Sequence, residues 1–156
     1  MNDNQLRCWL LQAGFSAADL LQADIDKALA NGTTPLMHAA RMGETEVVQA
    51  LLARGADPSL LNADRNGALW FACFADSQAC ATALINAGAQ LDSQNINGAT
   101  ALIYCASAGK AALVRLLLDA GANRDLMTLD DFTAPELAAS QECLKMLRAA
   151  RSVTHV

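Results

Sequence analysis

The side chains of this sequence that could carry chemistry are few: five cysteines and two histidines among 156 residues. Cysteine and histidine at short spacing would form a metal site, but neither a C-x-x-C nor an H-x-x-x-H pattern occurs. Cys73 and Cys80 lie seven residues apart, and the helical pattern described below assigns them to different helices. This arrangement favours a buried core pair over two metal ligands, so we expect no metal and no cofactor.

The cysteines could also act through their thiols. Their odd number leaves at least one thiol unpaired in a monomer. Cys73, Cys80 and Cys105 fall at apolar positions of the repeat, where a thiol behaves as a small buried hydrophobic group, and unpaired thiols fit a reducing cytoplasm. A thiol-based enzyme or redox protein that uses one of these cysteines is the alternative function. A fast-reacting thiol among these three in the native protein would favour it.

Carboxylates and glycines give no stronger catalytic pattern. Asp130 and Asp131 are adjacent, but they fall in an expected hairpin tip, where solvated turn carboxylates are more common than general acids or bases. Asn31-Gly32 and Asn97-Gly98 are turn-forming dipeptides, and no glycine-rich phosphate cradle accompanies them. We therefore expect that the protein is not an enzyme.

The charge of the chain restricts its partners. A net charge of −5 and a pI near 4.8 argue against nucleic acid, because phosphate binding requires a clustered basic surface. The densest basic set, Lys145, Arg148 and Arg151, has the spacing of a solvated helix face. No apolar run is long enough to span a bilayer, and Met1 to Gln5 do not begin a secretory signal. We expect a cytoplasmic protein that binds neither nucleic acid nor membrane.

A period of 33 residues defines the elements that would position these side chains. Within the first period, Thr34 and Pro35 can begin a helix and Gly43 can end it. A second helix ends near Gly55 and is followed by Asp, Asn and Gly residues typical of a loop or hairpin. Such a period is typical of stacked units that cover one another's apolar faces. The recurring leucine column is Leu36, Leu69 and Leu102, and the recurring Gly-Ala pairs begin at Gly55, Gly88 and Gly121.

The repeated segments resemble ankyrin repeats. Residues 32–40, Gly-Thr-Thr-Pro-Leu-Met-His-Ala-Ala, resemble the family signature G-x-T-P-L-H-x-A-A, and residues 51–57 resemble its close, L-L-x-x-G-A-D. The resemblance implies an all-α ankyrin-repeat solenoid of helix–turn–helix units joined by hairpin loops. We expect one domain over residues 1–156, divided into N-terminal cap helices at 1–33, full repeats at 34–66, 67–99 and 100–132, a C-terminal cap at 133–151 and a tail at 152–156.

The middle repeat departs from the pattern at three positions. Arg65 stands where its neighbours have glycine, Gly67 where they have threonine, and Asp76 where they have the glycine between helices. Because Asn66-Gly67 is a tight-turn dipeptide, we expect the hairpin before this helix to be reshaped. The helix also lacks its threonine cap, whose loss costs about 1 kcal/mol and less where glycine replaces it, as Gly67 does here. We therefore expect this repeat to be the least stable of the three.

Partners of ankyrin-repeat proteins contact the hairpin tips and the inner helices of a concave groove, so the resemblance implies a binding surface at the matching positions. One inner-helix column holds the ring-bearing residues His38, Phe71 and Tyr104. Phe71 and Tyr104 could be exposed anchors or could pack between inner helices, and both interpretations stay open. We expect His38 to be partly covered and Phe74 to be exposed. The candidate surface is His38, Arg41, Met42, Asp64, Asn66, Phe71, Phe74, Ile96, Asn97, Tyr104, Ser107, Leu129, Asp130 and Phe132.

The function that this resemblance implies is a monomeric, non-catalytic adaptor or inhibitor that binds another protein. The acidic balance of the chain favours a partner with a basic or neutral surface, because complementary charge speeds the encounter between two proteins. Shape and aromatic anchors would then determine the affinity.

Overall fold

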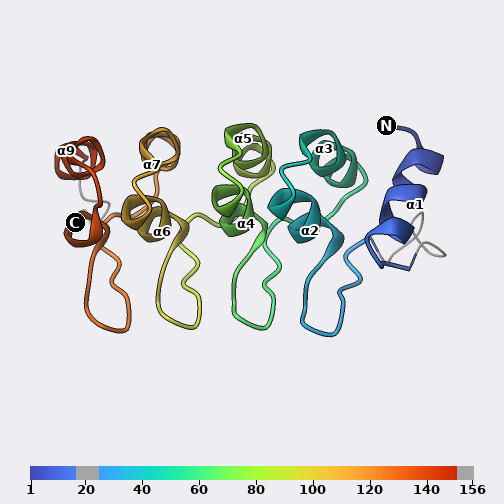
Figure 1. The fold of residues 1–156 in the computed structure, drawn as a ribbon, viewed down its shortest axis with the longest axis horizontal. Helices are drawn as coiled ribbons and strands as arrows, with labels where there is room; N and C mark the ends of the chain where they lie inside the picture. Colours follow the sequence, from blue (N-terminus) through green and yellow to red (C-terminus); the bar gives the residue numbers. More distant parts are fainter. Residues whose placement is uncertain (17–24, 151–156) are drawn as a thin grey trace. The chain divides into compact units, whose positions relative to one another are not determined.

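Two compact units, residues 1–89 and 90–156, make up the computed structural model, which describes residues 1–16 and 25–150. In the described residues the regular structure is helical, apart from an isolated antiparallel bridge between Leu61 and Gly67 (Figure 1). This confirms the predicted all-α class. The first unit contains α1 (Asp3–Gln12), α2 (Pro35–Arg41), α3 (Thr45–Ala53), α4 (Ala68–Phe74) and α5 (Gln78–Asn86). The second contains α6 (Ala101–Ser107), α7 (Ala111–Asp119), α8 (Ala134–Leu137) and α9 (Gln141–Ala149).

The first unit is built from two packed helix pairs. Helix α2 packs against α3 and α4, and α5 packs against α3 and α4. Leucines of both pairs lie in this core: Leu36, Leu51 and Leu84 are at most 1% exposed. Helix α2 begins at Pro35 because Thr34 Oγ1 accepts a hydrogen bond from the Met37 N–H at 3.2 Å. Capping and periodic burial, both visible in the sequence, therefore define these helices.

The second unit repeats the same plan. Helix α6 packs against α7 and α8, and α9 packs against α7 and α8. Leu102, Leu117 and Leu147 are at most 1% exposed. Thr100 Oγ1 caps α6 by accepting a hydrogen bond from the Ile103 N–H at 3.2 Å.

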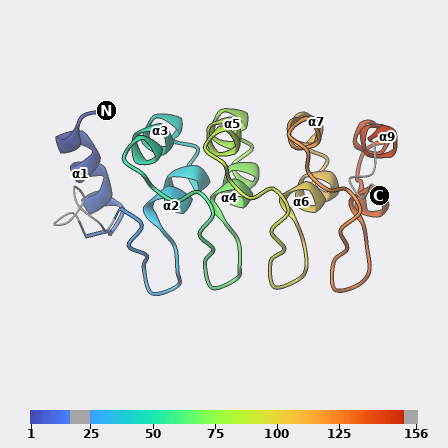
Figure 2. The same cartoon turned by 180° about the vertical axis from the view of Figure 1, so that it is seen from behind.

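A hairpin loop precedes each helix pair, and all four tips share two backbone hydrogen bonds. In each tip the first N–H donates to the fifth carbonyl, and the fourth N–H donates to the first carbonyl. Within the first unit, the Ala63 N–H donates to the Asn31 carbonyl at 3.0 Å, and within the second, the Leu129 N–H donates to the Asn97 carbonyl at 2.9 Å. Figures 1 and 2 show the two hairpins of each unit side by side. The tips are residues 29–33, 62–66, 95–99 and 128–132.

The hairpin before α4 keeps this geometry, so the expectation that Asn66-Gly67 would reshape it was wrong. Arg65 adopts the left-handed conformation, with φ of +62°, that glycine supplies at the matching position of other tips. Gly67 is extended, with φ of −105° and ψ of −179°, and stands at the N-cap of α4. It offers no side-chain cap, as predicted. Asp76 also takes a left-handed conformation, with φ of +56°.

The structure describes only part of the two predicted cap segments. Helix α1 occupies the position expected for the first N-terminal helix. Residues 17–24 of the predicted N-terminal cap lie outside the described residues, as does the predicted tail at 152–156. The pairs α6–α7 and α8–α9 lie within the second unit. The exact repeat and cap boundaries remain predictions.

Asp26 joins the first hairpin to the second, and its environment changes its acidity. The Asp57 N–H donates to both oxygens of the Asp26 carboxylate, at 3.0 and 3.3 Å. Burial raises the pKa of Asp26 above its usual value of 3.8, the Asp57 N–H lowers it in part, and the Asp57 carboxylate raises it further. The second unit has the same contact with neutral Asn123 in place of Asp57: the Asn123 N–H donates to the Asp92 carboxylate at 2.8 Å.

Asp57→Asn is therefore expected to lower the pKa of Asp26. The folded-state pKa lies above the unfolded value, so protonated Asp26 favours folding below pH 3.8, and this contribution is lost as pH rises through the folded pKa. The substitution reduces that loss and so increases the stability of the folded protein at pH values above the folded-state pKa of Asp26. Asparagine keeps the side-chain oxygen that accepts a hydrogen bond from the Ser59 N–H. Carboxyl NMR titration and urea unfolding as a function of pH measure both effects. An unchanged or higher Asp26 pKa would contradict this account.

Candidate functional site

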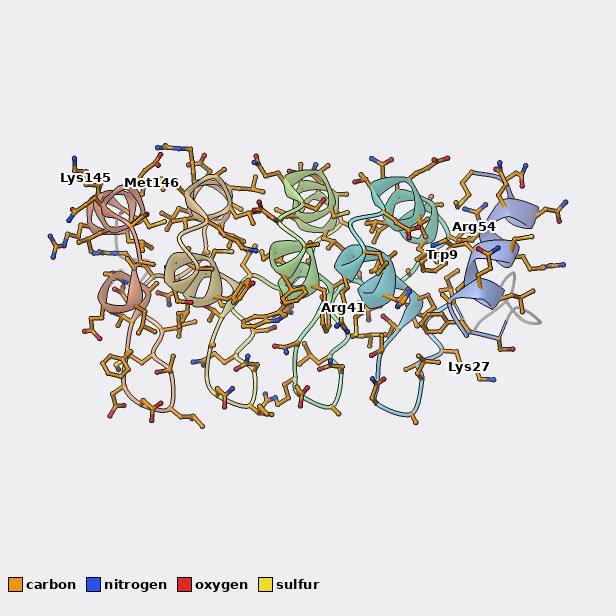
Figure 3. The ribbon with its side chains drawn as sticks, viewed as in Figure 1. Trp9, Lys27, Arg41, Arg54, Lys145 and Met146 are labelled. Carbon is orange, nitrogen blue, oxygen red and sulfur yellow. The ribbon has the colours of Figure 1, made fainter. Side chains whose placement is uncertain are left out.

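Arg41, Met42 and Phe74 form the most exposed part of the candidate surface on the helices of the first unit. Met42 and Phe74 are 58% and 52% exposed, which confirms the predicted exposure of Phe74. The guanidinium carbon of Arg41 lies 5.8 Å from the centre of the Phe74 ring, a cation–π geometry. Figure 3 shows Arg41 between α2 and α4. The two helices therefore combine a cation with two apolar side chains.

His38 is half-buried, as predicted, but its partners come from the N-terminal segment. Its ring centre lies 5.6 Å from that of Trp9 and 5.9 Å from that of Phe15. Trp9 extends from α1 toward the helix pair and donates its indole N–H to the Glu44 carboxylate (Figure 3). Sequence reasoning missed this arrangement, although an aromatic residue in an amphipathic terminal helix is a signal for docking onto the first repeat. His38 therefore helps to hold α1 against α2.

The other candidate residues of the first unit differ in exposure. Phe71 on α4 is half-buried, which is intermediate between the two interpretations left open for it. Asp64 is exposed at the tip 62–66, and Asn66 at the end of that tip is half-buried. The N–H groups of Asp64 and Asn66 both donate to Asn62 Oδ1 at 3.0 Å, so the tip is internally braced.

On the helices of the second unit, Tyr104 and Ser107 occupy neighbouring turns of α6. Tyr104 is half-buried, and the Lys110 ammonium lies 5.2 Å from the centre of its ring. Ser107 is exposed, and its hydroxyl donates to the Tyr104 carbonyl at 2.9 Å. This part of the surface is polar and locally hydrogen-bonded.

The hairpins of the second unit carry a group of exposed apolar side chains. Leu129, at 74%, is the most exposed of them, and Ile96 and Phe132 are 52% and 47% exposed. Sequence reasoning missed Met127, which is 50% exposed on the same hairpin as Leu129. The available signal for its exposure was that this methionine lies in a loop segment, where no helical pattern predicts burial. Asn97 and Asp130 are exposed at the same two tips.

A hollow of about 550 Å³ lies between α7 and α9 of the second unit. Arg115 and Asp119 of α7 and Lys145 and Met146 of α9 line it. None of the candidate surface residues predicted from the sequence lines this hollow. Its charged side chains have both signs, and no constellation typical of catalysis is present among its lining residues.

Four of the five cysteines are buried and one is exposed. Cys8 is exposed, whereas Cys73, Cys80, Cys105 and Cys143 are 0% exposed. The predicted burial of the three repeat cysteines is thereby confirmed. Among the described residues no group of three potential ligands could hold a metal ion. None of the described helices combines the length and apolar character needed to cross a membrane.

Titration of the native protein with a disulfide reagent is expected to modify about one thiol rapidly, because reaction requires an accessible thiolate. That thiol is Cys8, and the four buried thiols should react only when the protein unfolds. Cys8→Ser should remove the fast phase and leave the slow one. A fast phase that survives this substitution would instead favour the thiol-based alternative.

Comparison with known proteins adds sequence relationships to this geometry. A family model described as ankyrin repeats (3 copies) matches residues 3–95 and 69–154. The NAD-capped RNA hydrolase NUDT12 of Homo sapiens is 52% identical over 44 residues, which are 28% of this chain and 10% of that protein. Ankyrin repeat family A protein 2 of Mus musculus is 55% identical over 42 residues, which are 27% of this chain and 14% of that protein. The chain thus spans only a small part of either relative.

Proposed function

Because the chain belongs to the ankyrin-repeat family, we propose that it is a non-catalytic adaptor or inhibitor that binds another protein through its inner helices and hairpin tips. Ankyrin repeats are generally protein–protein interaction modules, and the family is typically non-enzymatic. The family match covers most of the chain, whereas each curated relative is matched over a short segment. The proposal therefore rests on the repeats and their exposed surface, and it does not transfer the activity named for either relative.

The observation that carries this proposal is the exposure of Phe74 and Met42 beside Arg41. Complete burial of a large apolar side chain stabilises a structure by about 1.5–3 kcal/mol, so a partner that covers Met42 and Phe74 would be bound more tightly. Aromatic residues and arginine are enriched among the residues that dominate binding energy at protein interfaces. The Arg41 guanidinium also brings donors suited to carboxylates and carbonyls. These properties support binding by surface contact, without a chemical step.

Phe74→Asp is the variant that tests the proposal. It replaces an exposed ring with a carboxylate, so the folded state is expected to keep its stability while a partner that buries the ring loses affinity by about tenfold or more. Quantitative affinity capture from native lysate, with wild type and variant compared, measures the loss. Circular dichroism on both proteins verifies that the variant is folded.

Leu11→Asp provides a matched control. Leu11 is 59% exposed on α1, so the chemical change and the degree of exposure resemble those at position 74, but the helix differs. We expect its capture profile to equal that of wild type. If no captured protein depends on Phe74, or if both variants lose the same proteins, the proposed surface is wrong.

Two further parts of the proposal concern the state of the protein. A reducing cytoplasmic location is part of the proposal, because four of the five cysteines are buried in the core as small hydrophobic groups and such a compartment keeps thiols reduced. We also propose a monomer, since a net charge of −5 opposes close contact between identical copies. Analytical ultracentrifugation tests the second point directly.

A further inference from the structure

The exposed apolar side chains of the second unit are confined to its two hairpins. Among its described residues, the exposed large hydrophobic side chains are Ile96, Met127, Leu129 and Phe132, and none lies on a helix. We call these four residues the tip patch. Isolated exposed apolar residues are common on protein surfaces, but an apolar group confined to one pair of loops marks an interaction site.

Backbone contacts between the two hairpins hold the tip patch together. The Leu129 N–H donates to the Asn97 carbonyl at 2.9 Å, which places the tip that carries Leu129 directly beside the tip that carries Ile96. Gln94 Nε2 donates to the carbonyls of Gly98 and Met127, both at 2.9 Å, and so bridges the hairpins a second time. A pre-organised surface loses little conformational entropy when a partner binds.

The charges around the tip patch are mostly acidic. Asp130 and Asp131 are exposed at the same tip as Leu129. Residues 90–100 and 121–133, which contain both hairpins, hold four carboxylates and one arginine. That arginine, Arg124, donates its Nη1 hydrogen to the Leu147 carbonyl of α9 at 2.8 Å, and its Nε lies 3.9 Å from the Asp125 carboxylate. The other described basic residues of the unit belong to α7, its N-cap or α9.

From this separation of charge we propose that the tip patch binds a basic, apolar segment of a partner protein, in which one or two large apolar residues are flanked by lysine or arginine. The inference rests on the proposed function and specifies its partner. The apolar side chains supply the affinity, and the carboxylates select the flanking charge and speed the encounter. Two copies of this chain would bring the acidic tips of both together, and an anionic membrane would repel them, so the charge opposes both occupants.

Selection from a random-peptide library on the full chain tests the proposal, with excess Leu129→Ser protein as the soluble competitor. The competitor keeps every charge, so peptides that bind by charge alone are removed. Leu129 is 74% exposed, and the substitution should leave the fold intact. We expect the surviving peptides to carry net positive charge and at least one large apolar residue. Surviving peptides that are acidic or neutral, or a selection that yields none, would overturn the proposal.

Fluorescence anisotropy with the most enriched peptide separates the two contributions. Leu129→Ser should weaken binding by about tenfold or more, and Asp130→Asn with Asp131→Asn should weaken it and flatten its salt dependence. Asparagine tolerates the left-handed conformation at position 131, where φ is +64°. Met42→Ser, which removes an apolar side chain that is 58% exposed in the first unit, should leave binding unchanged.

The possible failures can be told apart. Binding that ignores Leu129 or the two aspartates, or a dimer that Leu129→Ser abolishes, contradicts the tip-patch inference and leaves the Phe74 test of the proposed function standing. Peptides that depend on Leu129, together with capture that ignores Phe74, would support the tip patch and reject the helical surface.

Discussion

Gly98→Ala is expected to lower the free energy of unfolding by about 2–4 kcal/mol, although it adds a single methyl group. Gly98 has φ of +76°, where alanine is strained. A Cβ at this position would also lie 2.8 Å from the Leu129 nitrogen and 3.0 Å from the Thr128 backbone. Relief of that overlap would separate two hairpins that are joined by backbone and Gln94 hydrogen bonds. Urea unfolding followed by far-ultraviolet circular dichroism measures the loss.

Gly121→Ala distinguishes the overlap from backbone strain. Gly121 lies in the same unit with φ of +100°, and a Cβ there would have no atom within 4 Å. Only the conformational cost of about 1–2 kcal/mol should appear. Its φ is farther from the ordinary left-handed region than that of Gly98, so strain alone predicts the larger loss at Gly121. Equal losses at the two glycines, or a larger loss at Gly121, would show that contact between the hairpins is not the cause.

The periodic features of the fold could be predicted from the sequence because they depend on local chemistry. Thr34 and Thr100 satisfy backbone donors at helix starts, and the repeated leucines are buried where the period of 33 residues places them. Capping and burial are properties of residue type and spacing, so a single chain reveals them. The buried thiols followed from the same argument, because they replace apolar residues at core positions.

The middle hairpin shows where this reasoning failed. Asn66-Gly67 is a strong local turn signal, but the turn is formed by residues 62–66, with Arg65 in the left-handed position. The Asn62 side chain accepts from the N–H groups of Asp64 and Asn66, and the neighbouring Asn31 carbonyl accepts from Ala63. These contacts outweigh a cost of roughly 1–2 kcal/mol at Arg65. A turn prediction from two adjacent residues does not take into account hydrogen bonds to the neighbouring hairpin.

The exposure of some candidate residues was predictable from the sequence, whereas their contacts were less so. The exposure of Phe74 followed from its column, which also holds Arg41 and Ser107. The contact of His38 with Trp9 and Phe15 could not be derived from the period, because the N-terminal segment lies outside the repeated pattern. Met127 has a matching column, with Leu61 and Gln94, but that column mixes apolar and polar side chains and did not single out Met127. Three-dimensional contacts were needed to reveal the role of these residues.

Leu84→Ala is expected to lower the free energy of unfolding by about 2–5 kcal/mol, because it leaves a cavity in a fully buried part of α5. We expect this region to have little stability in reserve. Gly67 gives α4 no side-chain cap, and Arg65 and Asp76 both hold left-handed conformations. Both tryptophans of the chain lie in the first unit, and Trp70 is on α4, which packs against α5. Tryptophan fluorescence during urea unfolding therefore reports this change.

Ile85→Ala is the appropriate comparison for Leu84→Ala. Ile85 follows Leu84 on the same helix but is only half-buried, so removal of a similar aliphatic group should cost about 1–2 kcal/mol. In a repeat protein, stability is approximately a sum of unit and neighbour contributions, so a large loss in one unit need not be compensated by the others. If Leu84→Ala were no more destabilising than Ile85→Ala, burial of Leu84 in the core could not be the main source of stability in this repeat.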